Sequence, residues 1–212
     1  MPQSKFEKFL PLSGVLAGIL FGVSGFLQQV PQENSKADAL ALLTDHQTAN
    51  AISFIAGGLF LVVMCFFVAG VRQALRSGES GESSYSSVAY AGGVLMAGTF
   101  GLTAWLTLAM TDAASNKDAA SAQVLGTLGA AGWLPLIASM AVFYLATGLG
   151  GLRTAALPKW LAVVTTIMGV GCILGPVGIA AYFLTPLWLI ATGVVLSRRA
   201  EIVAVSPEPV TV

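Results

Sequence analysis

The stretch KWLAVVTTIMGVGCILGPVGIAAYFLTPLWLIATGVVLSR, residues 159–198, decides the fold, because it carries no charged side chain between its first and last residues. A helix of about 20 apolar residues crosses the hydrocarbon layer of a membrane, and this run has about twice that length. Gly175 and Pro176 interrupt the run near its middle. Proline ends helices because it lacks an amide donor and clashes with the preceding turn. We therefore expect two spans joined by a tight turn, at residues 158–174 and 177–197.

The rest of the chain has the composition of a membrane protein. Hydrophobic residues make up 56% of it and charged residues only 9%, with a mean hydropathy of +0.82. A soluble domain carries about 25% charged residues, so too few charges are present here to cover a water-facing surface. The sequence therefore predicts an all-α, polytopic transmembrane bundle of six spans over residues 10–199. The first four spans are expected at residues 10–30, 50–71, 88–110 and 124–148.

The loops predict the orientation of the bundle, because Lys and Arg are enriched in cytoplasmic loops. Only Lys36 and Lys117 fall on one side of the predicted membrane. We expect a multi-pass protein of the plasma membrane, with the N-terminus (1–9) and a disordered tail (200–212) in the cytoplasm. The outer loop, 31–49, is expected to hold a short surface helix. The cytoplasmic side receives Lys5, Lys8, Arg72, Arg76, Arg153, Lys159, Arg198 and Arg199.

The charge pattern argues against several functional classes. The net charge is zero and no basic stripe is present, so we expect no nucleic-acid partner. Ionisable side chains inside a membrane usually mark a transport path, and the centres of the predicted spans hold none. The chain has a single His, so a pair of histidine ligands for a haem is lacking. We expect no cofactor, no metal and no ion-driven transport.

Two of the predicted spans carry small residues at four-residue spacing. Such ridges let the backbones of membrane helices approach closely. They predict helix packing, either within the bundle or against a membrane-protein partner or a second copy of the chain. The ridges are Gly14, Gly18 and Gly22 in the first span and Ala89, Gly93, Ala97 and Gly101 in the third.

A few ionisable residues gather where the predicted spans reach the outer boundary. Asp45 and His46 precede the second span and Asp112 ends the third, so the three lie at similar predicted depth. Two carboxylates and a histidine could act as acid and base in catalysis. Asp45 at a helix start would instead cap the free amide groups there. We favour capping, because no catalytic or metal-binding spacing motif accompanies the three residues.

Other residues are candidates for binding a ligand inside the bundle. Thr99, Thr103 and Thr107 recur every fourth residue and form one polar stripe on the third span. Hydroxyl groups of this kind bond to their own helix, bridge neighbouring helices or line a narrow cavity. We expect Pro135 and Pro186 to kink the fourth and sixth spans, which opens room for a ligand.

The two cysteines lie in the second and fifth predicted spans. The expected depths of Cys65 and Cys172 differ by about 10 Å, which exceeds the roughly 7 Å reach of a disulfide between Cα atoms. We expect two free, buried thiols that behave as small apolar residues.

The chain also resembles a known group of proteins. The segment TAALPKWLAVVTTIMGV (154–170) has an L-P-K-W-L start to the fifth span that follows a short loop with an arginine. It resembles a group of six-span bacterial integral membrane proteins that is defined only as a domain of unknown function. GVLAGILFGVSGF (14–26), HQTANAISFIAGGLF (46–60) and LWLIATGVVLSRRA (187–200) are similar to that group as well. The resemblance implies six helices and a bacterial plasma membrane, and it brings no substrate or catalytic residues.

Three functional classes follow from these features. The leading one is a non-enzymatic bundle that binds a partner or a lipid-like ligand. The second is a small transporter or permeation path for an uncharged solute. The third is an outward-facing membrane enzyme that uses Asp45, His46 and Asp112. A cleft around these three residues would favour the enzyme, and a continuous cavity lined by the threonines would favour the transporter.

Overall fold

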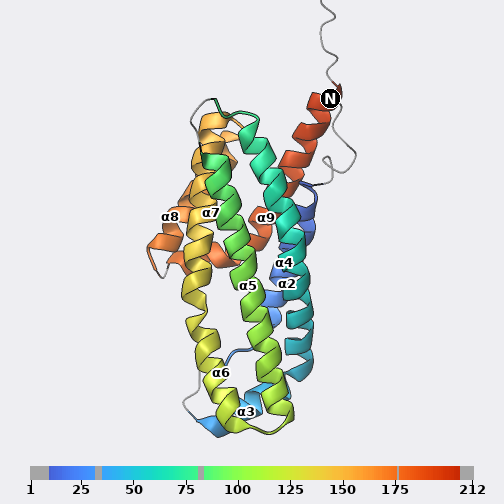
Figure 1. Ribbon diagram of the computed structural model, residues 1–212, viewed down its shortest axis with the longest axis vertical. Coiled ribbons are helices and arrows are strands. Elements are labelled where there is room, and N and C mark those ends of the chain that lie inside the picture. Colours follow the sequence, from blue (N-terminus) through green and yellow to red (C-terminus); the bar gives the residue numbers. More distant parts are fainter. Residues whose placement is uncertain (1–9, 32–34, 81–83, 176, 206–212) are drawn as a thin grey trace, which may run out of the picture.

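The chain folds as a helical bundle in the computed structural model (Figure 1), which describes residues 10–31, 35–80, 84–175 and 177–205, with side chains up to Arg199. The predicted all-α class is confirmed, because each regular element in this part of the chain is an α-helix. The expected cytoplasmic segment 1–9, Pro176 and residues 206–212 lie outside the described residues. The helices are α2 (Ser13–Leu27), α3 (Lys36–Asp45), α4 (Gln47–Arg76), α5 (Tyr85–Ser115), α6 (Ala119–Ala131), α7 (Trp133–Thr154), α8 (Lys159–Ile173) and α9 (Val177–Val205).

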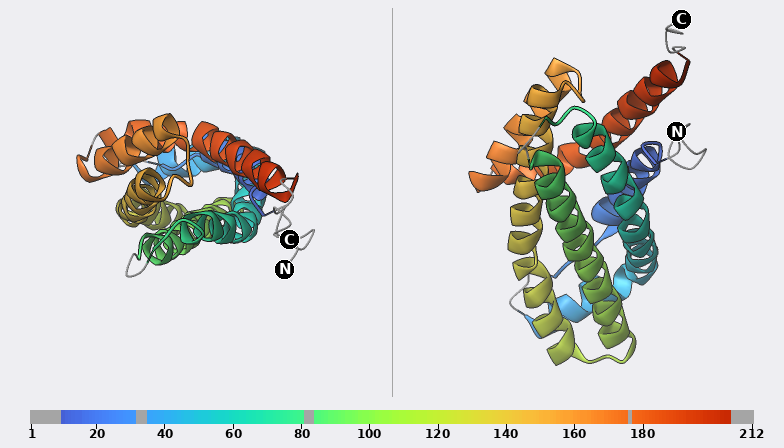
Figure 2. Two further views of the ribbon diagram at one scale, coloured as in Figure 1. Left: turned by 90° about the horizontal axis from the view of Figure 1, so that it is seen from above. Right: turned by 45° about the horizontal axis from the view of Figure 1, so that its top comes forward.

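Six of the helices close into a ring in which each helix packs against two neighbours. The order around the ring is α9, α2, α4, α5, α7 and α8, and α8 packs again on α9. Figure 2 shows this ring from above. α3 and α6 lie together at one end of the bundle, where α3 also contacts α5. Short connections between successive helices favour this arrangement of antiparallel neighbours.

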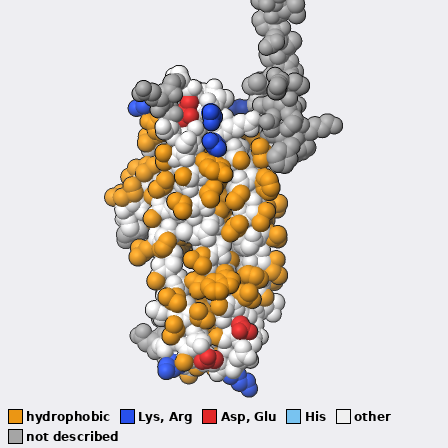
Figure 3. Space-filling model, viewed as in Figure 1, with side chains coloured by type: hydrophobic (Ala, Val, Ile, Leu, Met, Phe, Trp, Pro, Cys, Tyr) orange, Lys and Arg blue, Asp and Glu red, His pale blue; other side chains and the backbone are white. Residues whose placement is uncertain are grey.

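The surface and the helix lengths are those of a multi-pass membrane protein. Figure 3 shows a wide belt of apolar side chains between two ends that carry the charged ones. Large apolar side chains such as Ile55, Leu95 and Ile167 point outward. Apolar patches of this extent are rare on soluble monomers. In the part of the chain that the structure describes, four stretches are long and apolar enough to cross a membrane: Gln47–Arg76, Tyr85–Ser115, Ala119–Thr154 and Val177–Arg199.

Two of the six expected spans are shorter than a full crossing. α2 and α8 have 15 residues each, which corresponds to about 22 Å of helix against roughly 30 Å of hydrocarbon. α8 runs beside part of α7 and stops well short of the end that holds α3 and α6 (Figures 1 and 2). α9 starts from there and returns obliquely to the end where α4 leads into α5. The run of residues 159–198 is thus a two-helix hairpin, as expected, but its turn lies partway along the bundle.

Gly175 makes the turn of this hairpin. Its φ is +68°, in the left-handed region where residues with a side chain are strained and glycine is not. A residue of this conformation just after a helix ends it. The amide of Gly178 then donates to the carbonyl of Gly175 at 2.8 Å, at the start of α9. The predicted Gly-Pro turn therefore lies at the predicted residues.

The two prolines that were expected to kink the spans occupy different positions in their helices: one lies near a helix start and the other lies inside a helix. Pro135 is the third residue of α7, and the helix is interrupted at Gly132, between α6 and α7. A proline ring clashes with the carbonyl four residues before it, here that of Ala131, so the interruption precedes the proline. Pro186 lies inside α9 and packs against Gly18 and Gly22 of α2.

Aromatic side chains fill the centre of the ring over much of its length. Phe21 stacks on Phe100 with 4.4 Å between the ring centroids. Trp188 packs edge-on to Tyr144, with 4.9 Å between their rings, and to Phe143. All five of these rings are buried. Among the described residues, this packing occupies the path that a continuous channel would need.

The two ridges of small residues lie at contacts within the ring. A Cβ added to Gly18 would lie 2.6 Å from the carbonyl oxygen of Pro186 on α9. A Cβ added to Gly93 would lie 2.5 Å from the Val68 side chain on α4. Both sites require glycine because of close helix approach. Gly14, Gly22 and Gly101 also face neighbouring helices, and Ala89 and Ala97 are buried.

The extramembrane segments match the expectations in part. The expected surface helix in 31–49 is α3, which buries Ala39 and Leu43 against a small second core around Met110. The tail was expected to be disordered from residue 200. The backbone of α9 instead stays helical to Val205.

Candidate functional site

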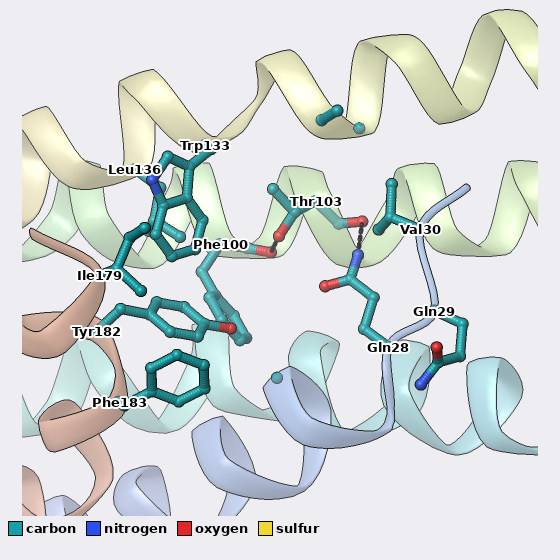
Figure 4. A pocket seen from close by; sticks show the side chains of 13 residues that line it. Gln28, Gln29, Val30, Phe100, Thr103, Trp133, Leu136, Ile179, Tyr182 and Phe183 are labelled. Carbon is teal, nitrogen blue, oxygen red and sulfur yellow. Dashed lines mark hydrogen bonds between the residues drawn. The ribbon is translucent and has the colours of Figure 1, made fainter. Parts of the chain in front are cut away.

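A cavity of about 600 Å³ lies between the end of α2, the middle of α5, the α6–α7 junction and the first turns of α9. This volume falls within the range of typical small-molecule sites, roughly 300–1,000 Å³. The described residues that line it are apolar, aromatic or uncharged polar, without a charged one. They include Gln28, Phe100, Thr103, Trp133, Tyr182 and Phe183 (Figure 4).

The short helices of the fold create this space. α2 ends at Leu27, and Gln28 continues in an extended conformation, with φ −65° and ψ 122°. The hairpin of α8 and α9 turns partway along the bundle, so it also leaves the region beside α6 uncovered (Figures 1 and 2). A full-length helix on either side would occupy this region. The cavity is therefore a direct consequence of the helix lengths.

Gln28 supplies the main polar group of the cavity. Its side-chain Nε2 donates to Thr107 Oγ1 at 2.6 Å and to the carbonyl oxygen of Thr103 at 3.5 Å. Figure 4 shows the amide reaching from the end of α2 toward α5. Both bonds use the donor side of the amide, and its carbonyl oxygen has no partner among the described residues. That oxygen is available to accept a hydrogen bond from a ligand.

Three aromatic rings form the opposite wall. Trp133 and Tyr182 lie with 4.7 Å between their ring centroids, and Phe100 closes the same wall. In Figure 4 these rings lie across the cavity from the Gln28 amide. Neither the Trp133 Nε1–H nor the Tyr182 hydroxyl donates to any group in the described part of the chain. The cavity thus offers two free donors and one free acceptor among apolar side chains.

The mouth of the cavity opens onto the apolar surface of the bundle. Ile179 and Phe183, on the first turns of α9, line the cavity and are 45% and 51% exposed. Phe26 at the end of α2 stacks against Phe183 with 5.8 Å between ring centroids. These side chains belong to the apolar belt, so a molecule would reach the cavity from lipid more directly than from water.

The threonine stripe has mixed roles. Thr103 lines the cavity, and Thr107 holds Gln28 in place. Thr99 bonds to the Leu95 carbonyl and to Ser139 on α7, away from the cavity lining. Pro135 and Pro186, the other two predicted ligand-binding residues, are not among the lining residues. The structure therefore brings one of the five candidates to the cavity wall.

The outer cluster of Asp45, His46 and Asp112 does not line the cavity. Asp45 is the last residue of α3, so the expected cap at the start of the next helix is wrong; His46 precedes α4 and makes no side-chain cap. The His46 Nδ1 lies 2.9 Å from the Leu42 carbonyl oxygen, and all three side chains are exposed. Within the described residues, no group of three His, Cys, Asp or Glu side chains could hold a metal.

Sequence reasoning missed three of the residues that make the cavity polar. Gln28, Trp133 and Tyr182 come from three separate segments and meet only in the folded bundle. Two signals were present in the sequence. A glutamine directly follows an apolar run, and Gly129 and Gly132 cluster just before a proline, which is typical of an interrupted helix.

The cysteines take different positions from those expected. Both are free, and Cys172 is buried as predicted. Cys65 is exposed on the outer face of α4, so the expectation of two buried thiols is wrong for this residue. A helix inside lipid exposes apolar residues on one face, and a thiol there meets lipid rather than protein.

Comparison of the chain with protein-family models, curated proteins and solved structures finds no match. The resemblance to six-span bacterial membrane proteins therefore stays a prediction.

Proposed function

We propose that this chain is a multi-pass protein of the bacterial plasma membrane that binds one uncharged, lipid-like amphipath in the cavity described above. The observation that carries the proposal is a cavity that opens to the apolar belt between Ile179 and Phe183 and contains the free carbonyl oxygen of Gln28. An apolar wall with a few convergent polar groups is typical of ligand sites.

The lining favours an uncharged ligand. A charge buried in a low-dielectric site without a partner is strongly unfavourable, and none of the described lining residues could pair with one. A hydroxyl or primary or secondary amide head would instead accept hydrogen bonds from Trp133 and Tyr182 and donate to Gln28. The hydrocarbon part of the ligand would contact Phe183 and extend through the mouth of the cavity into the lipid.

We further propose that both termini face the cytoplasm and that the α8–α9 hairpin enters and leaves from that side. The distribution of charge supports this orientation, because basic residues concentrate on cytoplasmic surfaces. Among the described residues, one end of the bundle carries two Lys or Arg residues, Lys36 and Lys117. The other end carries six: Arg72, Arg76, Arg153, Lys159, Arg198 and Arg199. The end with Lys36 and Lys117 also holds Asp38, Asp45, Asp112 and Asp118.

Several observations favour binding over the other two classes. The buried aromatic rings around Trp188 and Phe21 occupy the centre of the ring, which speaks against a permeation path. The exposed positions of Asp45 and His46, outside the cavity, speak against an enclosed catalytic site. The glycine ridges are engaged inside the bundle, which supports their role in its own packing rather than in a partner seam.

Native mass spectrometry of the protein released from membranes tests the proposal. Wild type should retain one uncharged lipid-sized adduct. Gly129→Leu should lose it, because a side chain there starts 3.3 Å from Val30 and extends into the cavity. Gly98→Leu is the matched control: it has open space around it on the lipid side and should retain the adduct.

A second measurement covers the case in which the natural ligand exchanges too quickly to be seen. In a variant with Trp133 as its only tryptophan, a brominated diacylglycerol should quench the fluorescence at low concentration. The Gly129→Leu version should require about tenfold more of the probe. Equal quenching in the two versions, together with equal adducts, would rule out the cavity as the binding site.

A further inference from the structure

A second hollow lies on the outer surface between α5 and α7, toward the end of the bundle that carries the Arg-rich loops. It is an open groove of about 790 Å³. Its lining includes Ser84, Tyr85 and Arg153 at one end and Val142, Leu145 and Leu149 further along. No residue of this groove lines the cavity, so the inference below does not depend on the function proposed above.

The groove changes from polar to apolar along its length. Arg153 is in the last turn of α7, and Val142 lies 11 positions earlier on the same helix. That separation corresponds to about 16 Å, close to the roughly 15 Å thickness of the hydrocarbon in one leaflet. Leu145 and Leu149 line the interval. The groove therefore has the length of one leaflet, with its polar end at the membrane boundary.

Arg153 gives the polar end a fixed positive charge. Its guanidinium carbon lies 5.3 Å from the centroid of the Tyr85 ring. Stacking of this kind orients the guanidinium and leaves its N–H edges free for a phosphate. Among the described residues no carboxylate pairs with Arg153, and no acidic residue lines the groove. The nearby Glu79 carboxylate accepts bonds from the Ser86 amide and hydroxyl instead.

We propose that this groove binds an anionic phospholipid of the leaflet on the Arg-rich side, with the phosphate on Arg153 and the Ser84 hydroxyl and one acyl chain along Leu149, Leu145 and Val142. Charge complementarity selects an anionic head over a zwitterionic one, because Arg153 has no carboxylate partner among the described residues. The apolar length selects a lipid over a soluble phosphate compound, which would fill only the polar end.

The test uses the full chain in nanodiscs of equal parts phosphatidylglycerol and phosphatidylcholine, with retained lipids counted by native mass spectrometry. Wild type should retain one phosphatidylglycerol with at least about tenfold preference, the scale of one charged hydrogen bond. Arg153→Gln should abolish that preference. Arg72→Gln is the matched control, because Arg72 also stacks on a tyrosine, 5.0 Å from the Tyr90 centroid, but lies outside the groove.

Leu149→Trp, which fills the apolar part from an exposed position and keeps Arg153, should lose the lipid as well. An equal loss of preference in Arg153→Gln and Arg72→Gln would show that the general positive charge of this end acts, and would overturn the proposal. So would retention of phosphatidylglycerol by Leu149→Trp. Displacement of the lipid by millimolar glycerol phosphate would identify a site for the head group alone and would also overturn it. Arg153 is exposed, so its variant should keep the circular dichroism of wild type.

Discussion

Ser24 on α2 and Ser53 on α4 bond to each other in both directions. The hydroxyl of Ser24 donates to the carbonyl of Ser53 at 2.9 Å, and that of Ser53 donates to the carbonyl of Ser24 at 2.7 Å. Both side chains are buried, and a Cβ added to Gly57, one turn away, would lie 2.9 Å from the Ser24 hydroxyl. The small residues therefore permit a close contact that the hydroxyl groups then satisfy.

We predict that Ser24→Ala and Ser53→Ala each lower the free energy of unfolding by about 1 kcal/mol, the usual scale of hydrogen bonds between membrane helices. The double variant should lose about the sum, because each hydroxyl has its own carbonyl acceptor. Unfolding in mixed micelles measures the three values. Ser87→Ala, at an exposed position, is the control and should change the free energy little. Single variants as stable as the control would contradict the prediction.

The turn of the hairpin gives a second prediction. Gly175→Ala should destabilise the protein by about 1–2 kcal/mol, because its backbone has a positive φ. The same change at Gly58, which lies inside α4 with open space around it, should stabilise by about 0.5–1 kcal/mol. Unfolding curves measure the change in the free energy of unfolding for both variants. If glycine-to-alanine changes this free energy in opposite directions at the two sites, the backbone conformation is the cause. Equal effects at the two sites would argue against the left-handed turn.

Asp118 leads to a prediction about pH. It is the N-cap of α6, and its carboxylate accepts bonds from the Ser121 hydroxyl at 2.6 Å and amide at 3.1 Å. These bonds hold the pKa of Asp118 below its ordinary value of 3.8. A depressed pKa stabilises the fold above the unfolded value, and the stabilisation is lost as the pH falls through the folded value.

The Tm difference between wild type and Asp118→Ala should therefore be constant near neutral pH and shrink once the pH drops below about 3.8. Asp118→Asn keeps an acceptor oxygen without a charge. The Tm difference between Asp118→Asn and Asp118→Ala should therefore not depend on pH between neutral and acidic conditions. If the Tm difference between wild type and Asp118→Ala persists in acid, the charge of the Asp118 carboxylate does not contribute to stability.

The proposed orientation predicts which sites react with an impermeant maleimide. In a chain without Cys65 and Cys172, Ser80→Cys should react only after the cells are opened. Ser115→Cys should react on intact cells. Ser80 lies in the connection before α5 and Ser115 is the last residue of α5, and both are exposed, so access to the reagent is the same apart from the side of the membrane. Reaction of both sites on intact cells would refute the orientation.

The outer cluster gives a prediction of no effect. His46→Ala and Asp112→Ala should leave both the Tm and the retained lipid adduct unchanged, because these side chains are exposed and line no part of the cavity. Thermal unfolding and native mass spectrometry measure the two quantities. Loss of the adduct in a variant that folds normally would return these residues to the functional site.

The sequence predicts those parts of the fold that depend on local chemistry. Runs without charge predict the apolar helices, and the Gly175–Pro176 pair predicts the turn of the hairpin. Helix boundaries are less certain, because Asp45 fits the start of one helix as well as the end of another. Asp45 is the last residue of α3, the helix of the outer loop, and α4 begins at Gln47.

The cavity depends on relationships that no local pattern contains. Gln28 bonds to Thr107 across 79 positions of sequence. Trp133 and Tyr182 meet only after α7 and α9 have packed. The space exists because α2 and α8 are short, and the sequence shows an apolar run of ordinary length in both regions.

The shallow turn of the α8–α9 hairpin has a consequence for how the protein is made. Leu174 and Gly175 of the turn, and Pro176 next to them in the sequence, have no polar side chain. In the orientation proposed above, the tip of the hairpin stays within the hydrocarbon, so the hairpin can enter the bilayer as one unit from the cytoplasmic side. Its insertion carries no hydrophilic loop to the opposite face, so the last two helices can join the ring after the first helices are already in place.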